Sequence, residues 1–293
     1  MHRKKSTMIK IISLLFSFLI TASLFSSSIL IVLHNTVFNY KFALKNIAAS
    51  GYYTTISKEI ENEFVSLGSA SGFDSDIFEN IIPKKTLEND INKYILDVYS
   101  NTPPKVDTSE LVSSLDNTFM DYANAKGITV TDETKKAIQT LEKSCAAVYS
   151  NYIGFSFAEQ VSTYLYKLNK VCIVILSVLT VFTLVLGTVL FLINRWKHIA
   201  IRNYIYSISA CILMLLPIPI AGFASHKIDK IGITSKSIYD FVVLYANNVL
   251  YHFIYIILLW LIILCVCIFL YIQRRNAVTK RKHESNTNDS NAE

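Results

Sequence analysis

Charged side chains are scarce in this 293-residue sequence. They make up 17% of it, against about 25% in an ordinary soluble protein. The shortage is concentrated in four apolar runs that contain no Asp, Glu or Arg and a single lysine, Lys10. These runs are Met8–Leu33, Val171–Ile193, Tyr204–Phe223 and Val249–Ile272. A protein that is soluble throughout its length is therefore excluded.

Motifs of the common enzyme classes are lacking as well. The sequence has no Gly-rich phosphate loop, no HExxH zinc motif and no GxSxG nucleophile turn. The middle of each apolar run also lacks the ionisable residue that ion-coupled transporters use. We therefore expect a non-enzymatic protein that needs no cofactor.

Cysteine occurs five times, but only Cys145 falls between the first two apolar runs. That region therefore cannot close an internal disulfide. We expect Cys145 to be a buried thiol on a helix, as free cysteines usually are; the alternative is a bridge to a second chain. The pair Cys265 and Cys267 does not have the spacing of a metal-binding CxxC.

What the sequence does contain is enough apolar length for four membrane crossings. Each run approaches or exceeds the roughly 20 residues that a helix needs to cross about 30 Å of hydrocarbon. The fold class predicted is all-α, with four transmembrane helices and an α-helical extracytoplasmic domain between the first two. In chain order, the predicted segments are a basic N-terminus (1–7), transmembrane helix 1 (8–34), the extracytoplasmic domain (35–170), transmembrane helix 2 (171–194), a basic cytoplasmic loop (195–203), transmembrane helix 3 (204–223), an external loop (224–248), transmembrane helix 4 (249–273) and a disordered cytoplasmic tail (274–293).

The orientation follows from the distribution of basic residues, which gather in short cytoplasmic loops. In a four-span chain the three basic groups fall on one side of the membrane. They are Arg3, Lys4 and Lys5; Arg195, Lys197 and Arg202; and Arg274, Arg275, Lys280, Arg281 and Lys282. Residues 35–168 hold 12 lysines, no arginine and 17 acidic residues, a net charge of −5. The overall charge of +6 therefore marks membrane topology and attraction to anionic lipid, and does not indicate a nucleic-acid partner.

The N-terminal run allows two interpretations. Basic residues followed by an apolar stretch and the small residues around Ala22–Ser28 are typical of a cleavable signal peptide. The apolar character continues to Leu33, however, beyond the 7–15 residues of a signal-peptide core. We expect an uncleaved anchor.

Between the first two runs, apolar residues recur at helical spacing. The predicted helices run from Tyr40 to about Leu67, around Asp76–Ile82, from Thr86 to Tyr99, from Asp107 to Gly127, and onward from Thr131. The last of these has only Gly154 as a weak point, so we expect it to continue almost straight into the second membrane crossing.

The segment Asp107–Glu110 has the form of an acidic capping box. Asp107 would accept hydrogen bonds from the free amides of the helix, and Glu110 would reach back.

Three segments of this region resemble those of a group of four-span membrane proteins of Gram-positive bacteria. They are the SGYY segment Ser50–Tyr53, the DTSEL segment Asp107–Leu111 and the turn Gly127–Glu133. The resemblance covers most of the region and implies a helical external domain. The shared motifs are a loop, a cap and a turn, and no activity is implied by them.

Candidate metal ligands are few. His34, His226 and His252 would lie near the outer membrane face, where three imidazoles could bind a metal. No two have the i, i+4 spacing of a helical metal pair, and interfacial placement without a ligand is the prediction.

The acidic residues also allow two interpretations, a functional site and a solvent-exposed face. Asp74 and Asp76 lack the glycine-containing loop of a calcium site, and Glu59, Glu61 and Glu63 alternate as on a solvated face.

Two prolines, Pro217 and Pro219, interrupt the third apolar run. Each lacks the amide that a helix needs, so this span is a possible pore lining or hinge. The alternative is a helix that ends near the outer interface.

The function expected is that of an integral cell-membrane protein with both termini cytoplasmic. Its external helical domain would sense or bind a ligand and pass the signal to a partner membrane protein or to a second copy of the chain. Two alternatives remain open. One is a transport or channel component built on Pro217 and Pro219, and the other is an envelope enzyme acting through external acids.

Overall fold

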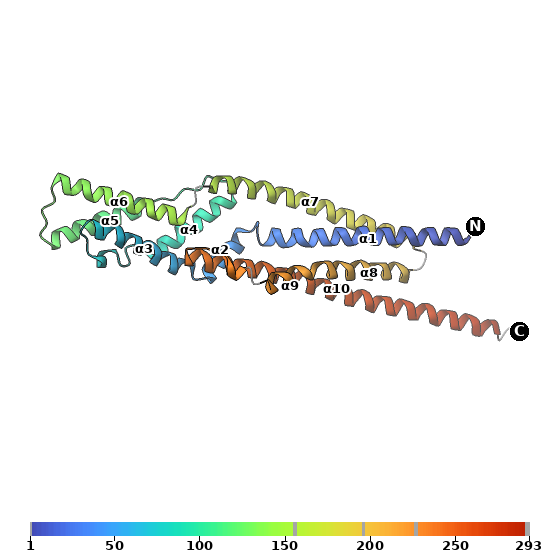
Figure 1. Cartoon of the computed structure of the whole chain (residues 1–293). Coiled ribbons are helices and arrows are strands. Elements are labelled where there is room, and N and C mark those ends of the chain that lie inside the picture. Colours follow the sequence, from blue (N-terminus) through green and yellow to red (C-terminus); the bar gives the residue numbers. More distant parts are fainter. Residues whose placement is uncertain (1, 155–156, 195–196, 226–227, 291–293) are drawn as a thin grey trace. The chain divides into compact units, whose positions relative to one another are not determined.

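The computed structural model describes all residues except 1, 155–156, 195–196, 226–227 and 291–293, and it leaves out the side chains of 2–7, 229 and 277–290. Figure 1 labels the helices. Within the described ranges the chain forms ten α-helices, two short 3-10 helices and no strand, which confirms the all-α prediction. Four helical stretches are long and apolar enough to cross a membrane, as in a multi-pass membrane protein.

The chain divides into two compact units. The first, here called the apolar unit, comprises residues 1–36, 170–230 and 246–293. The second, here called the helical domain, comprises residues 37–169 and 231–245. The stretch 231–245, placed by the sequence in a separate external loop, thus belongs to the helical domain.

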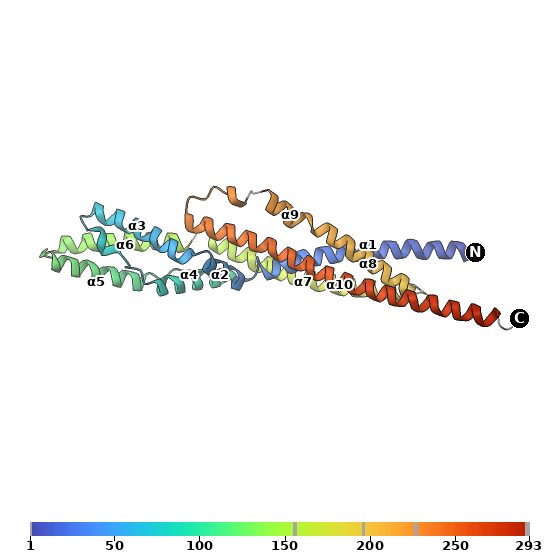
Figure 2. The same ribbon diagram turned by 90° about the horizontal axis from the view of Figure 1, so that it is seen from below.

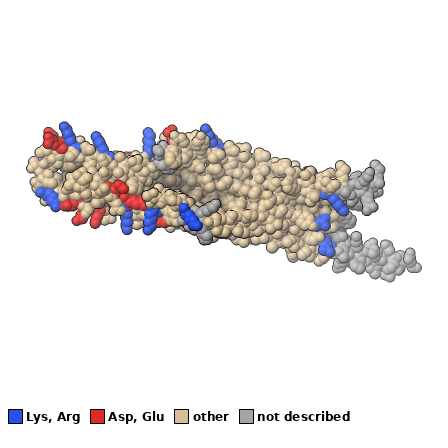
Figure 3. Space-filling view, in the orientation of Figure 1, with Lys and Arg blue, Asp and Glu red and all other residues tan. Residues whose placement is uncertain are grey.

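The apolar unit contains α1, α8, α9 and most of α7 and α10. Their bounds are α1 His2–Asn35, α7 Ala158–Ile193, α8 Lys197–Leu215, α9 Pro217–Ala224, the 3-10 turn η2 Ile228–Lys230, and α10 Lys236–Ser290. Most of the predicted basic loop 195–203 is therefore already helical, because its described residues from Lys197 onward form the start of α8. Figure 3 shows that the surface of this unit carries hardly any charge over most of its length on the face drawn.

The last helix, α10, is longer than the predicted fourth span at both ends (Figure 2). It starts at Lys236, inside the predicted loop 224–248, and continues to Ser290, through most of the tail predicted to be disordered. No glycine or proline occurs between these two residues, so nothing in the sequence terminates the helix once it has formed.

The third crossing is divided by its prolines. α8 ends at Leu215 and α9 begins at Pro217, which has no amide to continue the hydrogen-bond ladder. The chain nevertheless stays helical across the division, since the amide of Leu216 donates to Ile212 O at 3.0 Å. The helix therefore resumes beyond the break and extends to Ala224.

Small polar side chains join the helices of the apolar unit. The hydroxyls of Ser23 on α1 and Thr183 on α7 lie 2.6 Å apart, and Ser207 Oγ on α8 donates to the carbonyl of Ser17 at 2.8 Å. The indole of Trp260 on α10 donates to the Ser28 hydroxyl at 2.8 Å. Each of α7, α8 and α10 is thus hydrogen-bonded to α1.

The helical domain is built from α2 to α6, the first turns of α7 and the first turns of α10. Its own elements are α2 Tyr40–Ala49, α3 Tyr52–Ala70, the 3-10 turn η1 Ser75–Phe78, α4 Lys84–Tyr99, α5 Ser109–Ala125 and α6 Asp132–Ile153. One apolar stripe of each long helix faces a common core, as the helical spacing predicted. The largest fully buried side chains in this core are Phe64, Phe78, Phe119 and Tyr149.

Two glycines shape the first half of the domain. Gly51 has a φ of +73° and separates α2 from α3, so the single helix predicted from Tyr40 is two helices, joined at the SGYY segment. Gly68 lies inside α3 and faces the ring of Phe78 so closely that a Cβ would overlap it. The helix therefore runs past Gly68 to Ala70 and ends before Gly72, which has a φ of +84°.

The helix caps agree with the sequence in part. Asp107 Oδ1 accepts from the amide and the hydroxyl of Ser109, at 3.0 and 2.7 Å, so it binds a free amide of α5 as predicted, although the N-cap residue itself is Thr108. Glu110 does not reach back; it accepts from Thr86 of α4 at 3.5 Å. Thr131 caps α6 by accepting from the amide of Thr134 at 3.2 Å.

The continuous helix predicted from Thr131 to Ile193 is not present. α6 ends at Ile153, and Gly154 is extended, with a φ of −104° and a ψ of 166°. A new helix, α7, starts at Ala158 and continues to Ile193. A Cβ on Gly154 would lie 3.2 Å from the Tyr94 hydroxyl, so the glycine also allows α4 to approach at this point.

Candidate functional site

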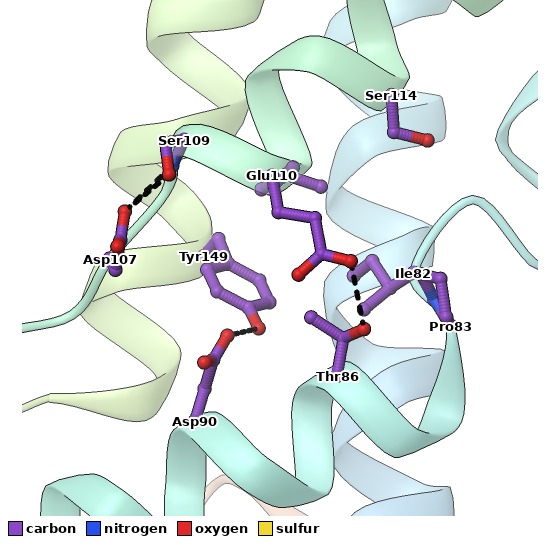
Figure 4. A pocket seen from close by; sticks show the side chains of 10 residues that line it. Ile82, Pro83, Thr86, Asp90, Asp107, Ser109, Glu110, Ser114 and Tyr149 are labelled. Atoms are coloured by element: carbon purple, nitrogen blue, oxygen red, sulfur yellow. Dashed lines mark hydrogen bonds between the residues drawn. The ribbon is translucent and has the colours of Figure 1, made fainter.

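A polar pocket, here called the acidic pocket, lies between α4, α5 and α6 of the helical domain (Figure 4). Its volume is about 180 Å³. Three carboxylates and four hydroxyls line it, together with a few apolar side chains. The lining residues are Ile82, Pro83, Thr86, Asp90, Asp107, Ser109, Glu110, Leu111, Ser114 and Tyr149.

Helical geometry places these groups together. Thr86 and Asp90 are four residues apart on α4 and therefore share one face of that helix. The Asp107 cap fixes the start of α5 and so sets the direction in which Glu110, in the first turn, leaves the helix. Tyr149 comes from the buried stripe of α6, and Figure 4 shows its hydroxyl directed toward Asp90.

Hydrogen bonds fix the floor of the pocket. Tyr149 Oη donates to Asp90 Oδ2 at 2.6 Å, although only 1% of the tyrosine is exposed. Burial, followed by the hydrogen bond to Asp90 and the nearby charges, raises the pKa of Tyr149 well above its usual range. The phenol therefore stays protonated and acts as a donor. Thr86 Oγ1 donates to Glu110 Oε1 at 3.5 Å across the mouth of the pocket.

The chemistry of this lining favours a positively charged group. None of the ten lining residues is Lys or Arg, and three of them are carboxylates. Carboxylate oxygens accept strong hydrogen bonds from ammonium and guanidinium groups. Ile82, Pro83 and Leu111 add a small apolar surface for the uncharged part of a ligand.

A second hollow of the helical domain lies beside the start of α10. It has a volume of about 550 Å³ and is lined by Ile56 and Glu59 of α3, Asn151 and Tyr152 of α6, and residues 234–238. Glu59 accepts hydrogen bonds there from Ser235 and Ser237.

The prolines, histidines and acidic metal candidates singled out by the sequence lie outside the acidic pocket. Pro217 and Pro219 belong to the apolar unit, where Pro217 is exposed and Pro219 is buried. His34 and His252 also belong to that unit, and His226 lies outside the described residues. In the part of the chain that the structure describes, no group of three His, Cys, Asp or Glu side chains could hold a metal.

The acidic residues of the predicted metal candidates have separate partners. Asp74 accepts from Tyr122 at 2.9 Å and pairs with Lys126 at 3.0 Å. These two partners, Lys126 first, lower the pKa of Asp74. Glu59 binds the start of α10, whereas Glu61 accepts from Ser57 of its own helix at 3.4 Å. The alternating acids of α3 therefore do not act as one cluster.

The sequence did not identify the pocket residues as a group. Asp107 and Glu110 were recognised as a cap, and Tyr149 as part of the core, but Asp90 and Thr86 had no distinguishing signal. An acidic residue one turn after a threonine, on the edge of an apolar stripe, is also typical of an ordinary exposed face. Only the packing of three helices shows that these side chains meet.

Comparison with known proteins adds no relative: no protein-family model, curated protein or solved structure matches this chain.

Proposed function

We propose that this chain is a non-enzymatic, multi-pass sensor of the cell membrane. Its helical domain lies outside the cytoplasm and binds a small, positively charged organic molecule in the acidic pocket. Binding is passed through α7 and α10 to the membrane helices and from there to a partner membrane protein or a second copy of the chain. The observation that carries the proposal is that α10 begins within the helical domain and continues unbroken through an apolar stretch of membrane-crossing length.

The charge distribution supports the orientation. All three basic groups fall on one side of a four-span chain, and basic loops are retained in the cytoplasm. The helical domain would then be outside together with its net negative charge. The resemblance of three of its segments to four-span proteins of Gram-positive bacteria agrees with this arrangement.

Two helices can serve as the output of the domain. α7 has its first turns in the helical domain, where Ala158 and Ser162 are buried, and continues to Ile193. α10 does the same from Lys236. The route predicted from the sequence, through α6, is interrupted at Gly154. Coupling through α7 and α10 therefore replaces it.

Ligand binding can be tested on the full-length protein in lipid nanodiscs. Calorimetric titration with ethanolamine hydrochloride should show saturable binding, with sodium chloride as the control for ionic strength. Asp90→Asn and Glu110→Gln should each weaken binding by at least about tenfold, the effect of losing a hydrogen bond to a charged group. Asp121→Asn, an exposed residue of α5 outside the pocket, is the matched control. Equal binding by all four proteins would exclude the pocket as the site.

Orientation and coupling need separate tests. A cysteine introduced at Lys105 should react with an impermeant thiol reagent in intact cells, whereas one at Lys197 should not; the reverse result would exclude this topology. Two glycines inserted after Lys170, within α7, should interrupt the helix and reproduce the phenotype of a gene deletion at normal surface levels. The same insertion after Gly154, where no helix is present to interrupt, is the control.

A second candidate, a transport or channel component, is favoured by one observation. The third crossing consists of two helices, α8 and α9, that meet at Pro217, and broken helices line the pathways of many transporters. Replacing Pro217 and Pro219 together by alanine would then abolish activity, while the α7 insertion would be tolerated. The sensor proposal requires the opposite pattern.

A further inference from the structure

The first turn of α10 is hydrogen-bonded to α3 through one carboxylate, that of Glu59. Its Oε2 accepts from the hydroxyls of Ser235 at 2.8 Å and Ser237 at 3.1 Å, and its Oε1 accepts from the amide of Ser237 at 3.0 Å. The two serine hydroxyls lie 2.8 Å from each other. Glu59 is thereby joined to two residues that follow it by 176 and 178 positions in the chain.

This carboxylate also completes the cap of the helix. Ser235 precedes α10 and accepts from two of its amides. Its hydroxyl accepts from the amide of Ile238 at 3.4 Å, and its carbonyl accepts from the amide of Tyr239 at 3.0 Å. The amide of Ser237, another amide of the first turn, finds its acceptor in Glu59. A negative charge at the N-terminus of a helix is also favoured by the helix dipole. Glu59 thus supplies both an acceptor and a charge where α10 needs them.

Without Glu59 the start of α10 would contain polar groups without partners. Ser237 is fully buried, with 0% of its surface exposed, and two of its donors depend on this carboxylate. A buried donor that loses its acceptor costs more than an exposed one, because water cannot replace the bond. One and two turns further on, Phe241 packs on Tyr52 and Tyr245 on Phe42, with ring centroids 6.1 and 5.2 Å apart. These ring contacts join α10 to the domain beyond its first turn.

The attachment is open to solvent on one side. The hollow of about 550 Å³ lies beside it, and Glu59 itself is only half-buried. A bond of this kind can be broken and remade without unfolding α3, whose apolar stripe of Ile56, Ile60 and Phe64 faces the core independently.

We infer that Glu59 is a latch: it fixes the first turns of α10 to the rest of the helical domain, and its release frees these turns while the rest of the domain stays folded. The latch does not depend on the acidic pocket or on its ligand. It can therefore be tested without any ligand, and its failure would leave the proposed binding site untouched.

The test is hydrogen exchange, followed by mass spectrometry, on the full-length protein in lipid nanodiscs. Glu59→Ala should accelerate exchange of the amides in residues 236–241 by at least about tenfold, as expected when a buried hydrogen bond to a charged group is lost. Exchange in α4 and α5 should not change. Glu59→Gln, which keeps an acceptor oxygen but not the charge, should give a smaller increase. Glu61→Ala, two residues along the same helix, is the control for loss of an acidic residue from α3.

The partners of the latch are tested by a double-mutant cycle. Ser235→Ala combined with Ser237→Ala should accelerate exchange in the same segment, and adding Glu59→Ala to this pair should have a smaller effect than in the wild type, because only the bond to the amide of residue 237 remains to be lost. Fully additive effects would overturn the latch, since they would mean that Glu59 and the serines act separately. Unchanged exchange in residues 236–241 of Glu59→Ala, or faster exchange throughout the domain, would overturn it as well.

Discussion

The two units of this chain are held together by different side chains. The core of the helical domain consists of large apolar groups, with Phe64, Phe78 and Phe119 fully buried. In the apolar unit, the large apolar groups of α7 and α10 are mostly on the outside, and Val178 is 62% exposed. The buried residues of that unit include small hydroxyl residues such as Ser17 and Ser28, as well as apolar residues.

The difference follows from the solvent that each unit faces. In water, an apolar side chain gains free energy by leaving the solvent, so the domain places its aromatic rings inside. In the proposed bilayer the solvent is itself apolar and this gain disappears; helices then associate through close packing and hydrogen bonds between small polar residues. The same type of side chain therefore contributes differently to the stability of each unit. This difference leads to four predictions.

The largest effect is expected from emptying the core of the helical domain. Phe119→Ala removes a fully buried ring that packs on the rings of Phe73 and Phe78. The ring centroids lie 4.8 Å and 5.9 Å from that of Phe119. It should lower the free energy of unfolding by about 3–5 kcal/mol. The free energy can be obtained from exchange of the slowest α5 and α6 amides. Val178→Ala, on the outside of α7, should change stability by far less, and equal losses would refute the comparison.

Overfilling the same core should have a smaller effect. Gly68→Ala places a methyl group on the ring of Phe78, which is fully buried and cannot move without displacing its neighbours. The expected loss is about 1–3 kcal/mol. Gly232→Ala is the matched control in the same domain, since a Cβ there would have no neighbour within 4 Å. If both variants have wild-type stability, the core is less tightly packed than described.

A buried acid should make the stability of the domain depend on pH. Glu142 of α6 is 6% exposed, and its Oε1 has no hydrogen-bond partner among the described residues. Burial, and then the neighbouring carboxyl of Asp116 on α5, raise the pKa of Glu142 above its ordinary 4.5. The folded domain therefore keeps this proton in a pH range where the unfolded chain has already released it.

The sign of the effect follows from this proton. Because the unfolded state binds fewer protons in that range, the contribution of Glu142 to stability falls as the pH rises from about 4.5 through the raised pKa, and is constant above it. Glu142→Gln should remove this decline and raise the stability of the domain at pH 8 by roughly 1 kcal/mol. Denaturant titrations at a series of pH values measure it. Parallel pH profiles for the two proteins would contradict the assignment.

The smallest effect is expected in the apolar unit. Ser23→Ala removes the 2.6 Å hydroxyl contact with Thr183, and such bonds between membrane helices average about 0.6 kcal/mol. Unfolding in mixed micelles can measure this change. Ser177→Ala is the control, because Ser177 is exposed and bonds only to the carbonyl of Ile173 in its own helix. A loss as large as that of Phe119→Ala would show that both units use the same forces.

The sequence predicted the elements of the fold better than their ends. Apolar spacing identified the buried faces of α3, α4, α5 and α6, because the period of a helix is visible in one dimension. The division between α2 and α3 was missed, since one glycine among good helix formers does not by itself end a helix. Gly154 was noted as a weak point, yet the sequence did not show that α6 ends there, next to Tyr94 of α4.

The candidate site was largely beyond prediction for the same reason. The groups of the acidic pocket come from three helices, and the latch joins Glu59 to residues that follow the third crossing. Each group looks like an ordinary surface residue within its own helix. The sequence did show that Asp107 accepts from an amide at the start of α5 and that α6 starts near Thr131, because these are local interactions.

One buried side chain gives the helical domain a reporter of its own motion. Cys145, predicted to be a buried thiol, has 0% of its surface exposed in α6 and is the one cysteine within residues 37–169. Burial, and then Glu142, raise its pKa to about 12, so at neutral pH almost no reactive thiolate is present. A water-soluble alkylating reagent can reach this sulfur only when α6 moves away from the core. The rate of its alkylation in the unmodified protein therefore measures how often the domain opens, on a timescale that a single structure does not record.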